Sequence, residues 1–73
     1  MSCITPEGRP TESGRKILNA LKQGRRSPEE IAKEAGLPLF RVRSGLRDMV
    51  GAGLAEVWGE EYHLTEKGES FLQ

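Results

Sequence analysis

The sequence predicts a mostly α-helical α+β domain, in which three helices are followed by a two-stranded hairpin and a short last helix. Apolar residues recur with helical spacing up to residue 50, and two short alternating runs then flank a glycine turn. The chain has 73 residues, enough for one domain with a small core. Residues 1–10 contain two prolines and no apolar periodicity, so we expect a flexible N-terminal arm there and the domain over residues 11–73.

The first helix is predicted over about residues 12–23. The hydroxyl of Thr11 can accept a hydrogen bond from the free N–H groups of the first turn. Gly24 is placed to end the helix in a left-handed conformation. The helix presents one apolar stripe, formed by Ile17, Leu18 and Leu21.

The second helix, over residues 28–35, has the clearest beginning in the chain. In "SPEEIAKEAG", Ser27 is placed to cap the helix, Pro28 occupies its first position, and Glu30 lies three residues after the serine. This spacing is that of a capping box with the favoured N-terminal proline. Gly36 is expected to end the helix.

The third helix is predicted over residues 38–51. Pro38 suits its first turn, and the "GAG" sequence at 51–53 stops it. Its apolar residues lie at i, i+4, i+7 and i+8, which indicates a strong core stripe that Leu39 would extend. The stripe consists of Val42, Leu46, Met49 and Val50.

The stretch "LAEVWGEEYHLTEKG" predicts a hairpin that leads directly into a last helix capped by Thr65. With Gly59 and Glu60 as a type II′ turn, Trp58 faces Glu61 and one face of the hairpin becomes apolar. A short strand near residues 25–27 would add a third strand. The side chains that we expect to be buried are Ile17, Leu21, Ile31, Val42, Leu46, Val57, Tyr62 and Leu64.

Composition excludes several classes of function. Cys3 and His63 are the only cysteine and histidine, too few for an internal disulfide or a zinc site, so we expect no metal and no cofactor. No residues are placed to form a catalytic site around His63, so we expect no enzyme. The sequence shows neither a long apolar run nor a secretory signal, so we expect no membrane partner and a cytoplasmic location.

The charges are unevenly spread along the chain. Residues 1–48 hold ten lysines and arginines against six acids, a net charge of +4, and residues 49–73 carry a net charge of −4. Such asymmetry indicates that one face suits an anion and another face avoids it.

The second and third predicted helices, joined through Gly36, form a helix-turn-helix. The exposed face of the third helix presents Phe40, Arg43, Ser44 and Arg47, with Arg41 beside them. An α-helix fits the DNA major groove, and arginine can read guanine there. Double-stranded DNA is therefore the expected partner of Arg41, Arg43, Ser44 and Arg47.

Three other residues have two interpretations each. Arg25 and Arg26 either hold phosphates or belong to a plain loop. We expect Phe40 to be half-buried against the first helix in preference to contacting a thymine methyl group.

The order and spacing of several short motifs resemble the winged helix-turn-helix core of MarR- and ArsR-like transcriptional regulators. These motifs are Ala32 and Gly36 spaced as A-x-x-x-G, Val42 and Leu46 in the third helix, "AGL" at 52–54 and "YHLTEKG" at 62–68. The resemblance covers about 60 residues of the chain. It implies a transcriptional regulator whose helix 38–51 enters the major groove and whose hairpin, or wing, lies along the DNA.

The tip of the hairpin keeps a second function open. Glu60 and Glu61 are acidic where a clamp on DNA needs basic residues, and Trp58 beside them is expected to be partly exposed. Tryptophan is enriched at interface hot spots. The alternative interpretation is therefore a winged helix that docks a second copy of the chain or another protein without sequence-specific DNA binding.

Overall fold

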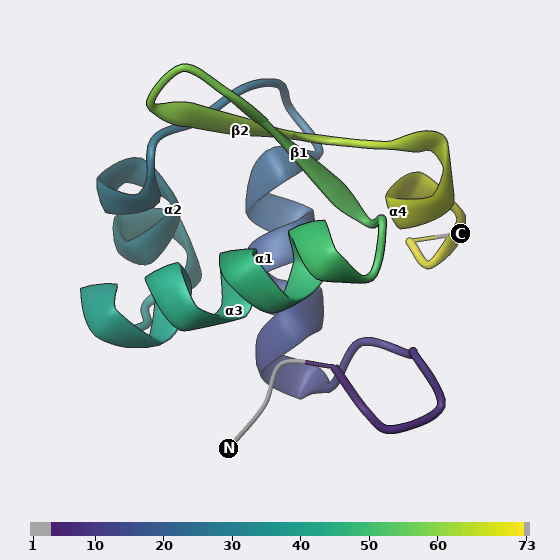
Figure 1. Ribbon diagram of the computed structural model, residues 1–73. Helices are drawn as coiled ribbons and strands as arrows, with labels where there is room; N and C mark the ends of the chain where they lie inside the picture. Colours follow the sequence, from purple (N-terminus) through teal and green to yellow (C-terminus); the bar gives the residue numbers. More distant parts are fainter. Residues whose placement is uncertain (1–3, 73) are drawn as a thin grey trace.

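The computed structural model describes residues 4–72, in which four helices accompany one antiparallel hairpin (Figure 1). Three helices pack against one another, the hairpin crosses one end of them, and the short fourth helix closes its base. This confirms the predicted α+β, mostly α architecture. The elements are α1 (Glu12–Leu21), α2 (Pro28–Ala35), α3 (Leu39–Gly51), β1 (Ala55–Trp58), β2 (Glu61–Leu64) and α4 (Glu66–Ser70).

The predicted N-terminal caps and the Gly36 cap are confirmed, but Gly24 does not cap α1 in a left-handed conformation: its φ is 132°, and the C-cap is Lys22 in a right-handed conformation. The side chains of Thr11 and Thr65 accept hydrogen bonds from Gly14 and Gly68, and Ser27 and Glu30 form both halves of the capping box. Gly36 ends α2 with φ 69° and ψ 33°, the left-handed conformation that glycine adopts at little cost.

Two predicted helix ends were wrong by one or two residues. The first helix ends at Leu21, because the N–H groups of Lys22 and Gly24 bond to carbonyls three residues back and tighten the last turn. Helix α3 begins at Leu39, because Pro38 has an extended backbone with ψ 145° and serves as the N-cap.

The hairpin has the predicted register. Trp58 pairs with Glu61, and Ala55 pairs with Leu64 at the other end. Gly59 has φ 66°, and Glu60 has a negative φ, as a type II′ turn requires. The predicted third strand is reduced to a single bridge, in which Arg26 and Tyr62 exchange two backbone hydrogen bonds of 2.8 and 3.0 Å.

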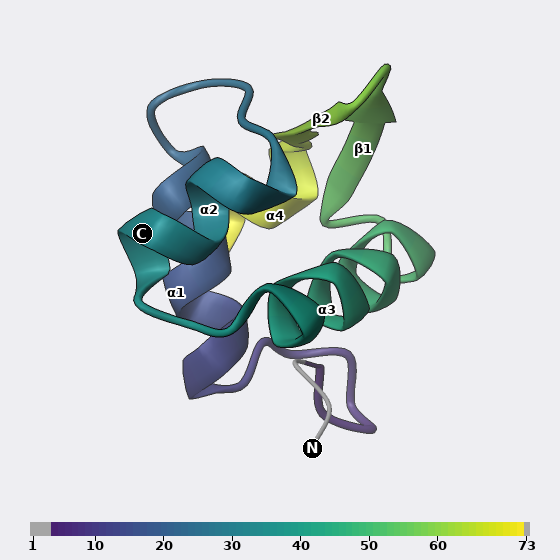
Figure 2. The same cartoon turned by 90° about the vertical axis from the view of Figure 1, so that its left-hand side faces the viewer.

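The core lies between the three helices and the base of the hairpin. Most of the predicted members are buried, and Leu54 joins them as the chain turns from α3 into β1. Val57 was wrongly predicted as buried, since 52% of it is exposed. The hairpin projects beyond the helices (Figure 2), so the apolar face of its outer half meets an open groove. Tyr62 and Leu64 were also predicted to be buried, but they are only half-buried against the core. The fully buried large side chains are Ile17, Leu18, Leu21, Ile31, Val42, Leu46, Met49 and Leu54.

The junction between the hairpin and α4 is tightly connected. The hydroxyl of Thr65 donates to the carbonyl oxygen of Gly53 at 2.6 Å, and its N–H donates to Leu54 at 3.2 Å. Gly68 is buried against the same carbonyl of Leu54, so closely that an added Cβ would collide with the carbonyl oxygen. Phe71 and Leu72 follow and pack on the core.

The N-terminal residues form a closed turn at the end of the helices opposite the hairpin (Figure 1). Ile4 and Pro10 form a bridge, the N–H of Thr5 donates to Arg9 at 2.7 Å, and Ile4 packs against the core. The flexibility expected for residues 1–10 stays a prediction. Cys3 lies outside the described residues.

Candidate nucleic-acid interface

Helix α3 has two different faces. Val42, Leu46 and Met49 are fully buried against the other helices. The opposite face exposes Arg43, Ser44 and Arg47, and Arg41 is half-buried beside it. The turn through Gly36 sets α3 across α2 (Figure 2). The exposed arginines therefore lie on the side of α3 that faces away from the core.

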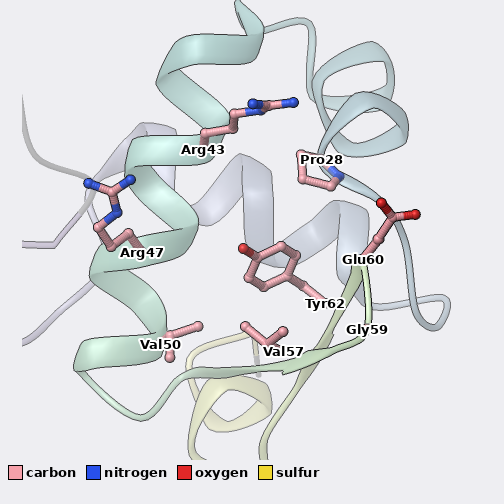
Figure 3. A pocket seen from close by; sticks show the side chains of 8 residues that line it. All are labelled: Pro28, Arg43, Arg47, Val50, Val57, Gly59, Glu60 and Tyr62. Carbon is pink, nitrogen blue, oxygen red and sulfur yellow. The ribbon is translucent and has the colours of Figure 1, made fainter.

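A groove of about 340 Å³ separates α3 from the hairpin (Figure 3). Arg43, Arg47 and Val50 of α3 form one wall, and the hairpin forms the other. Val50 and Val57 face each other across the lower part, and the ring of Tyr62 lies between the walls. The hairpin wall and the end at α2 are lined by Val57, Gly59, Glu60, Tyr62 and Pro28.

One of the two groove arginines is paired with a carboxylate. Nη2 of Arg43 lies 3.3 Å from Oε2 of Glu29, and both side chains are about three-fifths exposed. An adjoining hollow is lined by Arg43, Glu29 and Glu60 together. Within residues 4–72, the guanidinium of Arg47 makes no hydrogen bond or ion pair, and it points away from Glu60 (Figure 3). An ion pair as exposed as this one contributes little to the stability of the fold. Its main effect is on the charge and the orientation of the Arg43 side chain.

Arg26 lies away from the groove and serves the fold. Its Nε donates to the carbonyl oxygen of Ala20 at 2.9 Å and lies 2.9 Å from Oε2 of Glu34. Its Nη2 also donates to Gln23 at 3.3 Å. These contacts fix the guanidinium between α1 and α2.

The outer face of the hairpin carries an aromatic cluster. Trp58 is 63% exposed, as predicted, and the guanidinium of Arg25 lies 5.7 Å from its ring centroid, within cation–π range. His63 meets the tryptophan edge-on, with ring centroids 6.4 Å apart, and its Nε2 lies 3.7 Å from Oε1 of Glu56. Arg25 therefore belongs to the wing surface.

Phe40 was wrongly predicted to be half-buried against the first helix. Its side chain is 74% exposed. It lies in the first turn of α3, on the outer side, while Val42, Leu46 and Met49 occupy the core side of this helix. Val50 and Leu39, which were predicted to belong to the same core stripe, are instead 37% and 36% exposed. Phe40 is thus a free apolar surface at the start of the arginine-bearing helix.

The N-terminus of α2 borders the groove and is held by its capping box. The backbone N–H of Ser27 donates to Glu30 at 2.9 Å, and this bond, with the Ser27 hydroxyl, lowers the pKa of the Glu30 carboxyl. A lowered pKa means that the cap stabilises the fold at neutral pH and that this contribution is lost as the pH falls through the folded-state pKa.

The described residues offer little for other chemistry. In residues 4–72, no group of three or more histidine, cysteine, aspartate or glutamate side chains could hold a metal ion. No helix in this range is long and apolar enough to cross a bilayer.

The fold and this surface define a helix-turn-helix domain with a wing beside its second helix. The sequence profile of the winged helix-turn-helix family matches residues 11–73. The chain belongs to this family. No curated protein matches the chain.

Proposed function

We propose that the protein is a double-stranded DNA-binding module that acts in transcription by inserting α3 into the major groove. The observation that carries the proposal is the exposed arginine face of α3, directly opposite a face that is fully buried. The second helix of a helix-turn-helix lies in the major groove in DNA-binding proteins, and arginine is the residue that most often reads bases there.

The residues proposed to contact DNA are on or beside this face. Arg43, Ser44 and Arg47 face outward, and Arg41 lies at its edge. Arg26 would contribute by holding α2 in place, because its guanidinium is already bonded within the fold. Arg25 would reach DNA only with the wing, since it lies over Trp58.

Within the winged helix-turn-helix family, we propose that the protein is related to MarR- and ArsR-like regulators. We also propose that it is located in the cytoplasm and that it binds its partner without catalysing a reaction. A second function is favoured by the exposed Trp58 on the acidic wing. This surface would bind a second copy of the chain or another protein, as a docking module. The two functions use different faces and are separable by mutation.

Titration of a labelled random-sequence duplex tests the main proposal. If about four phosphates are neutralised, the slope of log K against log salt is expected near −3.6. Arg47→Ala is expected to weaken binding and to make this slope shallower by about 0.9, because one cation is lost. Arg15→Ala, which removes an exposed cation from α1, is the matched control and should change neither quantity. No binding at low salt, or equal effects of both variants, would overturn the proposal.

A charge reversal tests the role of the wing. Glu60→Lys with Glu61→Lys is expected to raise affinity for random duplex and to steepen the salt slope, because two anions near the DNA surface become cations. Trp58→Ala is expected to leave DNA affinity within about twofold and to weaken self-association, measured by sedimentation, since tryptophans often anchor interfaces. A Trp58→Ala loss as large as that of Arg47→Ala would place the wing within the DNA site instead.

A further inference from the structure

We propose that the two groove arginines have different tasks on DNA: Arg43 reads the edge of a guanine, and Arg47 holds a phosphate. The carboxylate of Glu29, which pairs with Arg43 alone, creates this difference. The inference rests on the proposed function and assigns the residues that determine sequence preference.

The starting observation is the unequal environment of two cations on one helix face. Nη2 of Arg43 is 3.3 Å from Oε2 of Glu29, whereas Glu60 lines the groove together with both arginines. The guanidinium of Arg47, one helical turn further along α3, makes neither an ion pair nor a hydrogen bond within the part of the chain that the structure describes. In Figure 3, the Arg43 guanidinium points toward α2, and that of Arg47 points to the opposite side of α3.

A phosphate and a base edge meet these environments differently. A phosphate brought to Arg43 carries a negative charge toward the paired carboxylate of Glu29, and their repulsion offsets part of the attraction of the arginine. The O6 and N7 atoms of guanine are uncharged acceptors and bring no such repulsion. Glu29 therefore disfavours phosphate at Arg43 and leaves the guanine edge as the preferred partner.

Glu29 also acts as a positioning residue. It holds a single nitrogen of the guanidinium, which leaves the remaining N–H groups of the fork free to donate. The pair joins α2 to α3, so it limits the rotamers of a long side chain before DNA arrives. Less side-chain freedom is then lost when Arg43 forms two parallel hydrogen bonds to one base.

Arg47 has the environment expected of a phosphate contact. Its charge is not offset by a paired carboxylate, so its field extends into solvent and attracts the DNA backbone. The acidic wing tip acts in the same direction at the groove as a whole. Glu60 lines the groove and would repel a phosphate that enters it, which limits sequence-independent binding.

The experiment first selects a preferred duplex from a random pool with the wild-type protein. Three quantities are then measured: affinity for the selected duplex, affinity for a scrambled duplex, and the salt slope. A selected duplex with each guanine replaced in turn by 7-deazaguanine, which lacks the N7 acceptor, identifies the base that is read. The expected result is a guanine whose replacement weakens wild-type binding about tenfold.

The variants separate the two arginines. Arg43→Ala should abolish the sensitivity to 7-deazaguanine and lower the ratio of selected to scrambled affinity about tenfold, with little change in salt slope. Arg47→Ala should keep that ratio and make the slope shallower by about 0.9. Glu29→Gln should tighten binding of the scrambled duplex about threefold to fivefold and lower the ratio. Glu69→Gln, the same charge removed from α4, is the control and should change neither.

Several results would overturn the inference while leaving DNA binding in place. These are a selected duplex without a sensitive guanine, equal changes of slope for the two arginine variants, and a Glu29→Gln variant that behaves like Glu69→Gln. Failure of the wild-type protein to bind any duplex would overturn the proposed function itself, and the inference with it.

Discussion

Replacing Leu46 by alanine is expected to lower the free energy of unfolding by about 2–5 kcal/mol. Leu46 has no exposed surface and lies at the centre of the buried face of α3. Truncation removes its apolar burial and leaves a cavity that its rigid neighbours can fill only in part. A domain of this size has a small margin of stability, so the variant should be largely unfolded at moderate urea concentrations.

Urea titration followed by circular dichroism measures the change. Val50→Ala is the matched control, because Val50 is on the same helix but 37% exposed to the groove. It should cost less than about 1 kcal/mol, since little burial is lost. If Leu46→Ala unfolds at the same urea concentration as the wild-type protein, the core described here is wrong.

Gly68→Ala is expected to destabilise the fold by about 1–3 kcal/mol or more, the usual cost of forcing extra atoms into a packed site. The added Cβ would collide with the carbonyl oxygen of Leu54 and would lie 3.2 Å from Cδ2 of Leu64. The carbonyl cannot move freely, because it accepts the N–H of Thr65 at the junction of the hairpin and α4. Thermal unfolding reports the loss.

The sign of this effect is informative, because alanine favours helices over glycine by about 1 kcal/mol. Gly51→Ala, at the end of α3, is the control. A Cβ there meets no atom within 4 Å, and the backbone of Gly51 is not in the left-handed region. Gly51→Ala should therefore be neutral or stabilising. A Gly68→Ala protein that is more stable than the wild type would mean that α4 does not pack as described.

The features that follow from neighbouring residues could be predicted from the sequence. The capping box needs only Ser27, Pro28 and Glu30 in order, and the hairpin register needs only a glycine turn and alternating side chains. Both depend on hydrogen bonds and side-chain directions within a few residues. The helix-turn-helix and the wing follow from such local elements.

Burial near the groove could not be predicted in the same way. The pattern indicated correctly that Val57 lies on the apolar side of the hairpin, but its exposure depends on how far the hairpin projects past α3. Phe40 has a similar explanation, since no described element between residues 4 and 72 covers its side chain at the start of α3. Helical and strand periodicity predict which way a side chain points. Burial also requires another helix or strand to cover the side chain on that side.

The partners of the arginines also depend on tertiary structure. Glu29 and Arg43 are 14 residues apart and meet only because α2 and α3 cross. The sequence identified Arg43 and Arg47 as equivalent candidates, and the carboxylate of Glu29 that distinguishes them became visible only in the fold. The sequence also treated Arg25 and Arg26 alike, as neighbours in one loop. In the fold, Arg25 lies over Trp58 of the wing and Arg26 bonds to the end of α1, and these contacts again depend on tertiary structure.

Arg26 joins three parts of the domain through one residue. Its backbone exchanges hydrogen bonds with Tyr62 of β2, and its side chain bonds to the end of α1 and to Glu34 of α2. The wing therefore cannot swing relative to the helix-turn-helix without breaking several of these bonds. Association with a partner then resembles the docking of a rigid body, in which little loop entropy is lost. A chain of 73 residues offers only a small contact area, and with little ordering cost a larger part of the interaction free energy appears as affinity.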